Sequence, residues 1–205
     1  MQAHFQARLQ GRAFTEDDLV AAFCGAWVSE GFLSREHEER RRQEGEDVLR
    51  RFHRMEAEHP WSPTAVEQEF AFWVDKTKVG GRYDLVIERE GEVTVLDFKT
   101  GDVHDLKTAQ ERAKESLQLD IYALAHLKTT GRLPRRVELR FLESGLVGGK
   151  EPTLDETHAT EERIREVARL VRRLSFTAQP SYRACSQCPF RDICPHTAHG
   201  PEVES

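Results

Sequence analysis

Three charged side chains interrupt two apolar runs in the segment RYDLVIEREGEVTVLDFKTG, residues 82–101. Asp84 lies in the first run, and Asp97 and Lys99 lie in the second. Both runs are rich in residues that favour strands, and Glu90-Gly91 between them can form a tight hairpin turn. A buried strand would carry apolar residues at the three charged positions, so their charges indicate either a chemical role or a solvent-exposed face.

The expected register of this hairpin brings the two carboxylates together. With a two-residue turn, Arg89 pairs with Glu92, and the same register sets Asp84 directly opposite Asp97. The Cβ atoms of such opposed residues lie about 4.5–5.5 Å apart. Because side chains alternate along a strand, we expect Lys99 on the same face as Asp97.

Two carboxylates at that separation suit a divalent cation. They repel each other, and one would take up a proton unless a cation lay between them. Hard oxygen ligands around an open position favour Mg²⁺ or Mn²⁺. Lys99 beside them could stabilise developing phosphate charge or help to deprotonate a water molecule. The alternative is an exposed sheet face with an ordinary salt bridge.

Two further polar side chains follow in the segment QLDIY. Gln118 and Tyr122 are four residues apart, so they share one face of a helix. They could reach DNA or a metal-bound phosphate. The alternative is that Tyr122 is a core residue that packs with Leu119 and Ala123.

The elements that must position these residues follow from the hydrophobic periods. Helical periodicity and capping signals alternate with β-rich runs, in the order helix, helix, three strands, helix, strand, helix. This order predicts an α/β fold with a mixed central sheet flanked by helices. Besides the hairpin, the expected helices are 15–30, 34–59, 108–127 and 161–174, and the expected strands are 65–74 and 136–144.

Length and charge limit the remaining possibilities. The chain has 205 residues, enough for one domain or one domain with a small appendage. We expect a single domain with a helical part (1–64), a catalytic sheet and helix (65–145), a C-terminal helix with the cysteines (146–196) and a frayed tail (197–205). The net charge of −6 argues against a wholly basic nucleic-acid binder. The apolar stretches are too short to span a membrane, which predicts a cytoplasmic protein.

Taken together, the motifs resemble those of the PD-(D/E)XK nuclease superfamily, in its RecB-like branch. The matching segments are GGRYD with Asp84, VLDFKTG with Asp97 and Lys99, and QLDIYALA with Gln118 and Tyr122. The resemblance covers the chain from about Gly31 to the last cysteine. It is strongest to the C-terminal nuclease module of UvrD/PcrA-type helicases, and it includes GRLPRRVELRFLESG and YRACSQCPFRDICP.

The resemblance implies a restriction-endonuclease-like α/β fold and metal-dependent cleavage of DNA. Asp84, Asp97 and the carbonyl oxygen of Phe98 would bind the metal ion, and Lys99 would position or activate the attacking water. Gln118 and Tyr122 would shape the site. The substrate would be single-stranded DNA or DNA ends, in repair, recombination or defence.

One position departs from the family pattern. Many relatives carry a histidine metal ligand in a G-x-x-x-H context on a helix before the hairpin. Counting from Gly45 places Leu49 at that position. His53, one turn later, is the best substitute. Glu67 and Glu69 offer another acidic ligand, with Glu67 the better match by family position.

The four cysteines form a second candidate centre. Cys185, Cys188 and Cys194 cluster near the C-terminus, and Cys24 lies far upstream. This arrangement is similar to that of iron–sulphur nucleases of the AddB and CRISPR-adaptation types, which implies a [4Fe–4S] cluster that staples the N-terminal helix to the tail. Structural zinc is the alternative, since four thiolates also form a tetrahedral site. Only one C-x-x-C pair is present, and this favours iron–sulphur.

A different class of function remains open. If the site lacks a needed ligand, the chain would be a catalytically silent DNA-binding module with a structural or redox-sensing cluster, accessory to a helicase. The sequence contains no G-x-x-x-x-G-K-[ST] loop, so a helicase motor would have to be a separate partner or another part of a longer protein.

Overall fold

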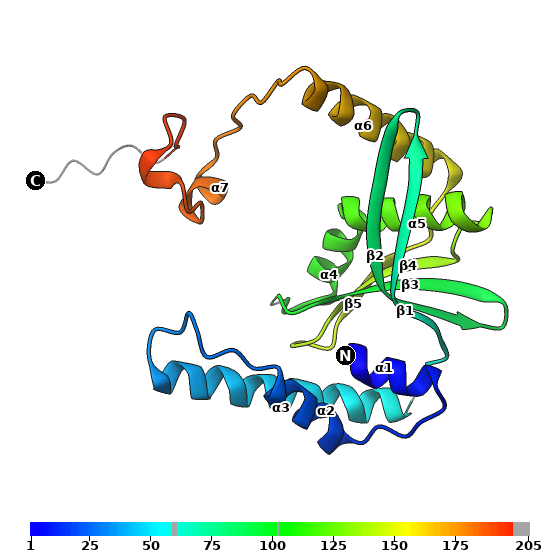
Figure 1. Ribbon diagram of the computed structural model, residues 1–205, viewed down its shortest axis with the longest axis vertical. Coiled ribbons are helices and arrows are strands. Elements are labelled where there is room, and N and C mark those ends of the chain that lie inside the picture. Colours follow the sequence, from blue (N-terminus) through cyan, green and yellow to red (C-terminus); the bar gives the residue numbers. More distant parts are fainter. Residues whose placement is uncertain (59–60, 102, 199–205) are drawn as a thin grey trace, which may run out of the picture. The chain divides into compact units, whose positions relative to one another are not determined.

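The computed structural model describes residues 1–58, 61–101 and 103–198. The chain divides into two compact units, Met1–Ile164 and Arg165–Ser205. Nearly all of the regular secondary structure lies in the first unit, which contains the sheet and the predicted site (Figure 1).

The first unit is built on a five-stranded mixed sheet. The spatial order is β1-β2-β3-β4-β5, with β3 parallel to β4 and every other neighbouring pair antiparallel. The strands are β1 (Pro63–Val74), β2 (Thr77–Arg89), β3 (Glu92–Lys99), β4 (Arg136–Phe141) and β5 (Val147–Lys150). The single parallel pair requires a crossover, which the two helices between β3 and β4 provide.

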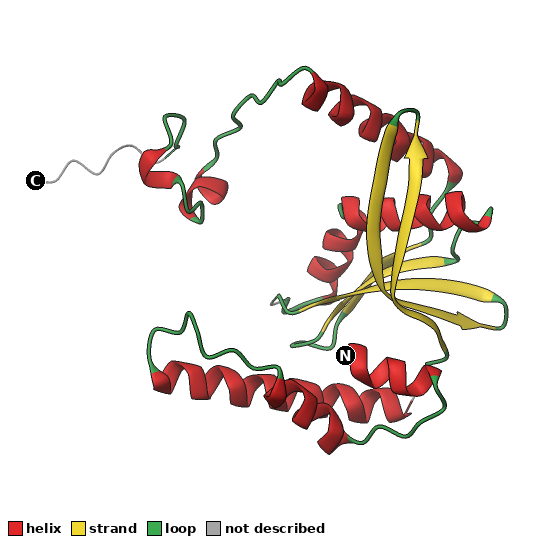
Figure 2. Ribbon diagram, viewed as in Figure 1, coloured by secondary structure: helices red, strands yellow, loops and turns green. Residues whose placement is uncertain are grey.

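Helices cover both faces of the sheet (Figures 1 and 2). On one face lie α1 (Gln2–Leu9), α2 (Glu16–Gly25) and α3 (Arg35–Glu58), and on the other lie α4 (Leu106–Lys114) and α5 (Leu117–Thr130). Each face has its own apolar core. Phe5, Leu49 and Leu96 belong to the α1–α3 core. Leu119 and Val95 belong to the α4–α5 core. The predicted α/β fold with a mixed sheet between helices is confirmed.

The central hairpin has the register that the sequence predicts. Arg89 pairs with Glu92, and the ladder continues to Leu85 opposite Leu96. Glu90 and Gly91 have φ angles of 55° and 81°. Two successive positive φ values are typical of a type I′ turn, whose twist matches that of the strands it joins.

Some predicted elements differ from the structure. The helix expected over 108–127 is two helices, because Ser116 ends the run and its hydroxyl accepts a hydrogen bond from Leu119 N at 3.3 Å. The strand β5 was not predicted. The helix α6 (Leu154–Arg172) begins seven residues before the expected start at Glu161, because Thr153 and Glu156 form reciprocal hydrogen bonds that cap its first turn.

The second unit contains the end of α6, the short helix α7 (Tyr182–Ser186) and a 3-10 turn at Arg191–Ile193. Most of the expected frayed tail, residues 199–205, lies outside the described residues, as does His59, the last residue of the helix expected over 34–59. Within the described ranges, none of the helices combines the length and apolarity needed to cross a bilayer.

Candidate active site

The acidic pair sits at the end of the β2–β3 ladder. Leu85 and Leu96 form the last pair, so Asp84 and Asp97 occupy the next position in the same register. The Asp84 carboxylate accepts a hydrogen bond from Phe98 N, with a distance of 2.9 Å between N and Oδ2. Asp84 therefore reaches across to the β3 backbone immediately beside Asp97.

Lys99 and Gln118 form a polar network around Asp97. The Lys99 ammonium lies 2.7 Å from Asp97 Oδ2 and donates to Gln118 Oε1, also at 2.7 Å. Gln118 Nε2 in turn donates to Asp97 Oδ1 at 2.6 Å. Asp97 and Lys99 lie two residues apart on β3, and Gln118 lies in the first turn of α5, capped by Ser116. The end of one strand and the start of one helix thus meet at Asp97.

Tyr122 connects this network to β2. Its hydroxyl accepts from Gln118 Nε2 at 2.9 Å, donates to the Arg82 carbonyl oxygen at 2.9 Å, and lies 3.3 Å from Asp97 Oδ1. The side chain is also buried in the α4–α5 core with Leu119 and Ala123. Both interpretations made from the sequence therefore apply: the ring is a core residue, and the hydroxyl is part of the site.

The site carries more negative charge than its own cation balances. Asp97 is 2% exposed, and its Oδ2 atom accepts no hydrogen bond; its contact there is the ion pair with Lys99. Burial raises the pKa of Asp84, and the neighbouring charges of Asp97 and Glu67 raise it further, against the opposing effects of Phe98 N–H and Lys99. Burial, followed by the charge of Asp97, also raises the pKa of Tyr122. A second cation would balance this negative charge, and the buried Asp97 carboxylate is suited to be one of its ligands.

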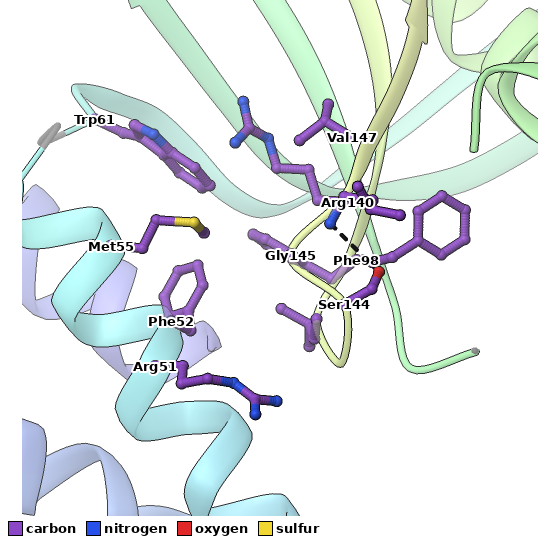
Figure 3. A pocket seen from close by; sticks show the side chains of 12 residues that line it. Arg51, Phe52, Met55, Trp61, Phe98, Arg140, Ser144, Gly145 and Val147 are labelled. Atoms are coloured by element: carbon purple, nitrogen blue, oxygen red, sulfur yellow. Dashed lines mark hydrogen bonds between the residues drawn. The ribbon is translucent and has the colours of Figure 1, made fainter. Parts of the chain in front are cut away.

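Phe98 is fixed from the opposite face of the sheet. Its ring stacks on Phe5 and Trp61, with centroid distances of 6.0 and 6.3 Å, and meets Phe52 edge-on at 6.1 Å. The ring lines an apolar pocket of about 240 Å³ between α3 and the β4–β5 connection (Figure 3). Arg140 lies over the Trp61 ring, 4.2 Å from its centroid. This packing holds the backbone N–H that binds Asp84 and the carbonyl group predicted to bind metal.

An ion pair lies beside the site. Glu67, one of the two expected alternative acidic ligands, pairs with Arg82, a residue that was not predicted, at 2.6 Å between Oε2 and Nε. The only available signal for Arg82 was its place two residues before Asp84 in GRYD.

His53 lies in a different environment from the acidic pair. Its Nε2 atom is 3.0 Å from the Phe14 carbonyl oxygen, and its ring packs edge-on against His4 at 5.5 Å between centroids. Leu49, at the expected histidine position, is buried in the α1–α3 core. The structure therefore brings together Asp84, Asp97, Lys99, Gln118 and Tyr122 and leaves His53 apart from them.

The cysteines are divided between the two units. Cys24 is in the first unit, and its thiol donates to Glu46 Oε1 at 3.4 Å; partial desolvation of the sulphur and this carboxylate raise the pKa of Cys24. The other three lie in the second unit and are free thiols. The Ala198 N–H lies 3.4 Å from Cys185 Sγ and lowers the pKa of that thiol.

No three His, Cys, Asp or Glu side chains lie together as a ready metal site anywhere in residues 1–58, 61–101 and 103–198. The donor chemistry nonetheless fits a divalent ion at the acidic pair, because the buried Asp97 carboxylate, with Lys99 as its one cation among the described residues, lies next to the Asp84 carboxylate. Four free thiols are likewise the donors that a [4Fe–4S] cluster requires.

Comparisons with known proteins identify the family of the chain. The sequence model of the PD-(D/E)XK nuclease superfamily matches residues 1–195. A "Putative exonuclease" from Eubacterium rectale has a similar structure, with 12% identity and a TM-score of 0.52 over 97% of this chain and 74% of that chain. A protein called SSO0001 shares 16% identity and a TM-score of 0.49 over 95% of this chain and 100% of that one. No curated protein matches the sequence. With the family model covering almost its full length, the acidic hairpin and the cysteines included, the chain belongs to the PD-(D/E)XK nuclease superfamily.

Proposed function

We propose that the chain is a metal-dependent deoxyribonuclease of the RecB-like branch that hydrolyses phosphodiester bonds in single strands or at DNA ends. The observation that carries the proposal is the convergence of Asp84, Asp97 and Lys99, in which the buried Asp97 carboxylate pairs with the Lys99 ammonium beside Asp84. Repair, recombination or defence is the proposed process, with a helicase as the proposed partner.

Each side chain has a role that its contacts support. Asp84, Asp97 and the Phe98 carbonyl would hold Mg²⁺ or Mn²⁺, which when bound supplies charge neutralisation at the phosphate. Lys99 would position the attacking water and stabilise charge that develops on phosphate oxygens. Gln118 would hold Lys99 and Asp97 in place through the hydrogen bonds already described. To join the ligands, the His53 ring would have to leave the Phe14 carbonyl.

The test of this proposal is cleavage of end-labelled DNA with Mg²⁺ or Mn²⁺. We expect wild-type protein to cut linear single strands, whereas Asp97→Asn and Lys99→Met should bind DNA, remain folded and fail to cut. Strands labelled at the 5′ or the 3′ end give the polarity, and circular single strands report endonuclease action. Because proteins with one fold can catalyse different reactions, the name of the Eubacterium rectale protein cannot replace these cleavage assays. Unchanged cutting by Asp97→Asn would show that the site is wrong.

A second candidate function is a catalytically silent DNA-binding module. It is favoured by one observation, that no third metal-ligating side chain joins Asp84 and Asp97 within the described part of the chain. DNA binding by wild-type protein without cutting in Mn²⁺ would support this alternative.

We further propose that Cys24, Cys185, Cys188 and Cys194 hold a [4Fe–4S] cluster rather than zinc. The cluster would have a structural role, since metal binding is coupled to folding in such sites. Anaerobically purified protein should absorb at about 400 nm, as expected for iron bound by cysteine thiolates, and should contain iron and sulphide. Colourless protein that contains one zinc ion would favour the zinc alternative.

A further inference from the structure

The far half of the β1–β2 hairpin extends beyond the rest of the sheet, and we call its residues 69–82 the hairpin arm. The β1–β2 ladder continues to Val74 opposite Thr77, whereas β3 pairs with β2 from Leu85 to Arg89. Figure 1 shows this part of the hairpin rising past the other strands. The inner face of the arm packs on the α4–α5 core through Phe70, Phe72, Val74 and Tyr83.

The outer face of the hairpin arm is exposed along its whole length. Because side chains alternate along a strand, the residues between the inward-facing ones point to the opposite side. They form three exposed cross-strand pairs: Trp73 with Lys78, Ala71 with Gly80, and Glu69 with Arg82. Along β2 the same face leads toward Asp84 of the acidic pair. Lys78 and Asp84 are six residues apart, which is roughly 20 Å along a strand.

The tip of the hairpin arm combines an open aromatic ring with positive charge. The Trp73 side chain is 63% exposed and lies across from Lys78. The turn adds a second exposed lysine, Lys76, beside a single acidic residue, Asp75. Proteins bind single-stranded DNA with this combination, because the ring stacks on an unpaired base while the cations contact the phosphates.

Gly80 keeps the middle of the outer face flat. A Cβ atom there would meet only the Phe70 carbonyl oxygen, at 3.6 Å, so packing does not require a glycine at this position. At Gly81, by contrast, a Cβ atom would lie 2.5 Å from the Phe70 ring, so packing explains that glycine. A glycine weakens the interior of a strand, and it often marks a place where a ligand approaches the backbone closely. Gly80, with only Ala71 opposite, fits such an approach.

We propose that the outer face of the hairpin arm binds single-stranded DNA and guides it to the acidic pair, with Trp73 stacked on a base and Lys76 and Lys78 on phosphates. The inference rests on the proposed function, since this strand is the one that the site would cut. An exposed indole favours a single strand, because unpaired bases are free to stack on it. Arg82 receives no phosphate, because it already pairs with Glu67 at 2.6 Å.

DNA binding tests this inference separately from cleavage. Fluorescence anisotropy with a labelled oligothymidylate, on the full chain and without divalent metal, measures affinity. Trp73→Leu should weaken binding by at least about fivefold, the lower end for loss of one stacked base. Trp73→Phe keeps a ring and should retain most of the affinity. A purely structural role for Trp73 would leave the affinity of both variants unchanged.

The salt dependence of binding tests the role of the lysines. Lys78→Met should reduce the slope of log affinity against log salt concentration by about 0.7, the value for one phosphate contact on a single strand. Arg89→Met is the matched control, because Arg89 is an exposed cation on the same strand that lies beyond Asp84 in the opposite direction. It should leave both the affinity and the slope unchanged. An equal change of slope in the two variants would overturn the role of Lys78.

Gly80→Val provides a variant that should not unfold. Valine favours strands, so the urea-unfolding midpoint should stay the same or rise. The added side chain would stand on the flat part of the outer face, and DNA binding should weaken. Wild-type affinity in a folded Gly80→Val protein would show that DNA does not approach the backbone there.

The outcomes separate this inference from the proposed function. If Asp97→Asn stops cleavage while the Trp73, Lys78 and Gly80 variants bind like wild type, the inference fails and the proposed function stands. If these variants bind weakly but wild-type protein cuts nothing in Mn²⁺, the arm binds DNA and the proposed cleavage fails. If light scattering shows a wild-type dimer that Trp73→Leu dissociates, with DNA binding unchanged, the face contacts a second copy and the inference is overturned.

Discussion

At the scale of single residues, the site depends on a few hydrogen bonds that fix charged groups. Tyr122 is the least obvious member, because its ring belongs to the core while its hydroxyl joins Gln118 to the Arg82 carbonyl. Sequence spacing was sufficient to place Gln118 and Tyr122 on one helix face. It could not show that the hydroxyl reaches β2, since that contact spans forty residues along the chain.

Tyr122→Phe should separate the two roles of this residue. The ring would still fill the core, but the Arg82 carbonyl would lose its donor, at a cost of about 1–3 kcal/mol in the free energy of unfolding. Gln118 Nε2 would lose one hydrogen-bond acceptor, so the rate of metal-dependent cleavage should fall by roughly tenfold. This corresponds to an increase of about 1.4 kcal/mol in the activation free energy. Urea unfolding and a cleavage assay measure these effects. If the variant is destabilised but its cleavage rate is unchanged, Tyr122 contributes to the packing of the core and not to cleavage.

At the scale of elements, the hairpin was predictable and the crossover was not. A Glu-Gly turn between two alternating runs fixes the β2–β3 register, and with it the positions of Asp84 and Asp97. The break between α4 and α5 has no glycine or proline to announce it; it depends on the Ser116 cap. β5 has the sequence VGGK, which lacks the apolar alternation that identifies strands.

The Ser116 cap should matter for both stability and cleavage. Ser116→Ala removes the acceptor for Leu119 N and should cost about 1 kcal/mol of stability. It should also slow cleavage, because Gln118 lies in the turn that the cap fixes, and Ser116→Asp should restore both. Asp105→Ala is the matched control, since Asp105 caps α4 by accepting from Thr108 N at 2.8 Å. Asp105→Ala should lower the free energy of unfolding by a similar amount and keep its cleavage rate. If both variants cleave more slowly, the effect of Ser116→Ala is not specific to the turn that holds Gln118.

Gly148 explains why β5 can lie against α4. A Cβ atom at this position would lie 1.9 Å from the Ala109 carbonyl oxygen, a separation that the backbone cannot tolerate. Gly148→Ala should therefore lower the free energy of unfolding by about 1–3 kcal/mol or more, as overpacking does. Gly80→Ala is the comparison, because its Cβ would meet only the Phe70 carbonyl at 3.6 Å. Equal urea-unfolding midpoints for the two variants would contradict this account of the β5–α4 contact.

At the scale of the whole molecule, the family match extends beyond the sheet into the second unit. It covers residues 1–195 and so includes all four cysteines, whereas the acidic pair and its network lie entirely within Met1–Ile164. Residue types and spacing predicted the acidic pair, whereas the [4Fe–4S] cluster is a prediction that rests on the family resemblance. Cys24 and the other three thiols belong to different units, so the assignment of one shared cluster continues to depend on iron analysis.

The stability of the molecule should depend on pH through one buried carboxylate. Glu56 is 2% exposed and joins α3 to α1 and to the start of the next segment, with contacts to Arg8 (2.5 Å), His4 (3.3 Å) and Trp61 N (3.1 Å). Burial acts to raise the pKa of Glu56, but hydrogen bonds from His4 and Trp61 N and the charge of Arg8 outweigh it, and the pKa lies below its ordinary value of 4.5.

Because the folded-state pKa of Glu56 is lowered, its contribution to stability is present above pH 4.5 and is lost as pH falls through the folded-state value. Glu56→Gln should cost about 3 kcal/mol at pH 7, as does the loss of one partner of a buried ion pair. The gap between wild type and variant should narrow steadily as pH falls below 4.5, because protonated glutamate and glutamine carry the same charge. Urea unfolding of both proteins from pH 7 downward measures this gap. A gap that stays constant with pH would mean that the carboxylate contributes through packing alone.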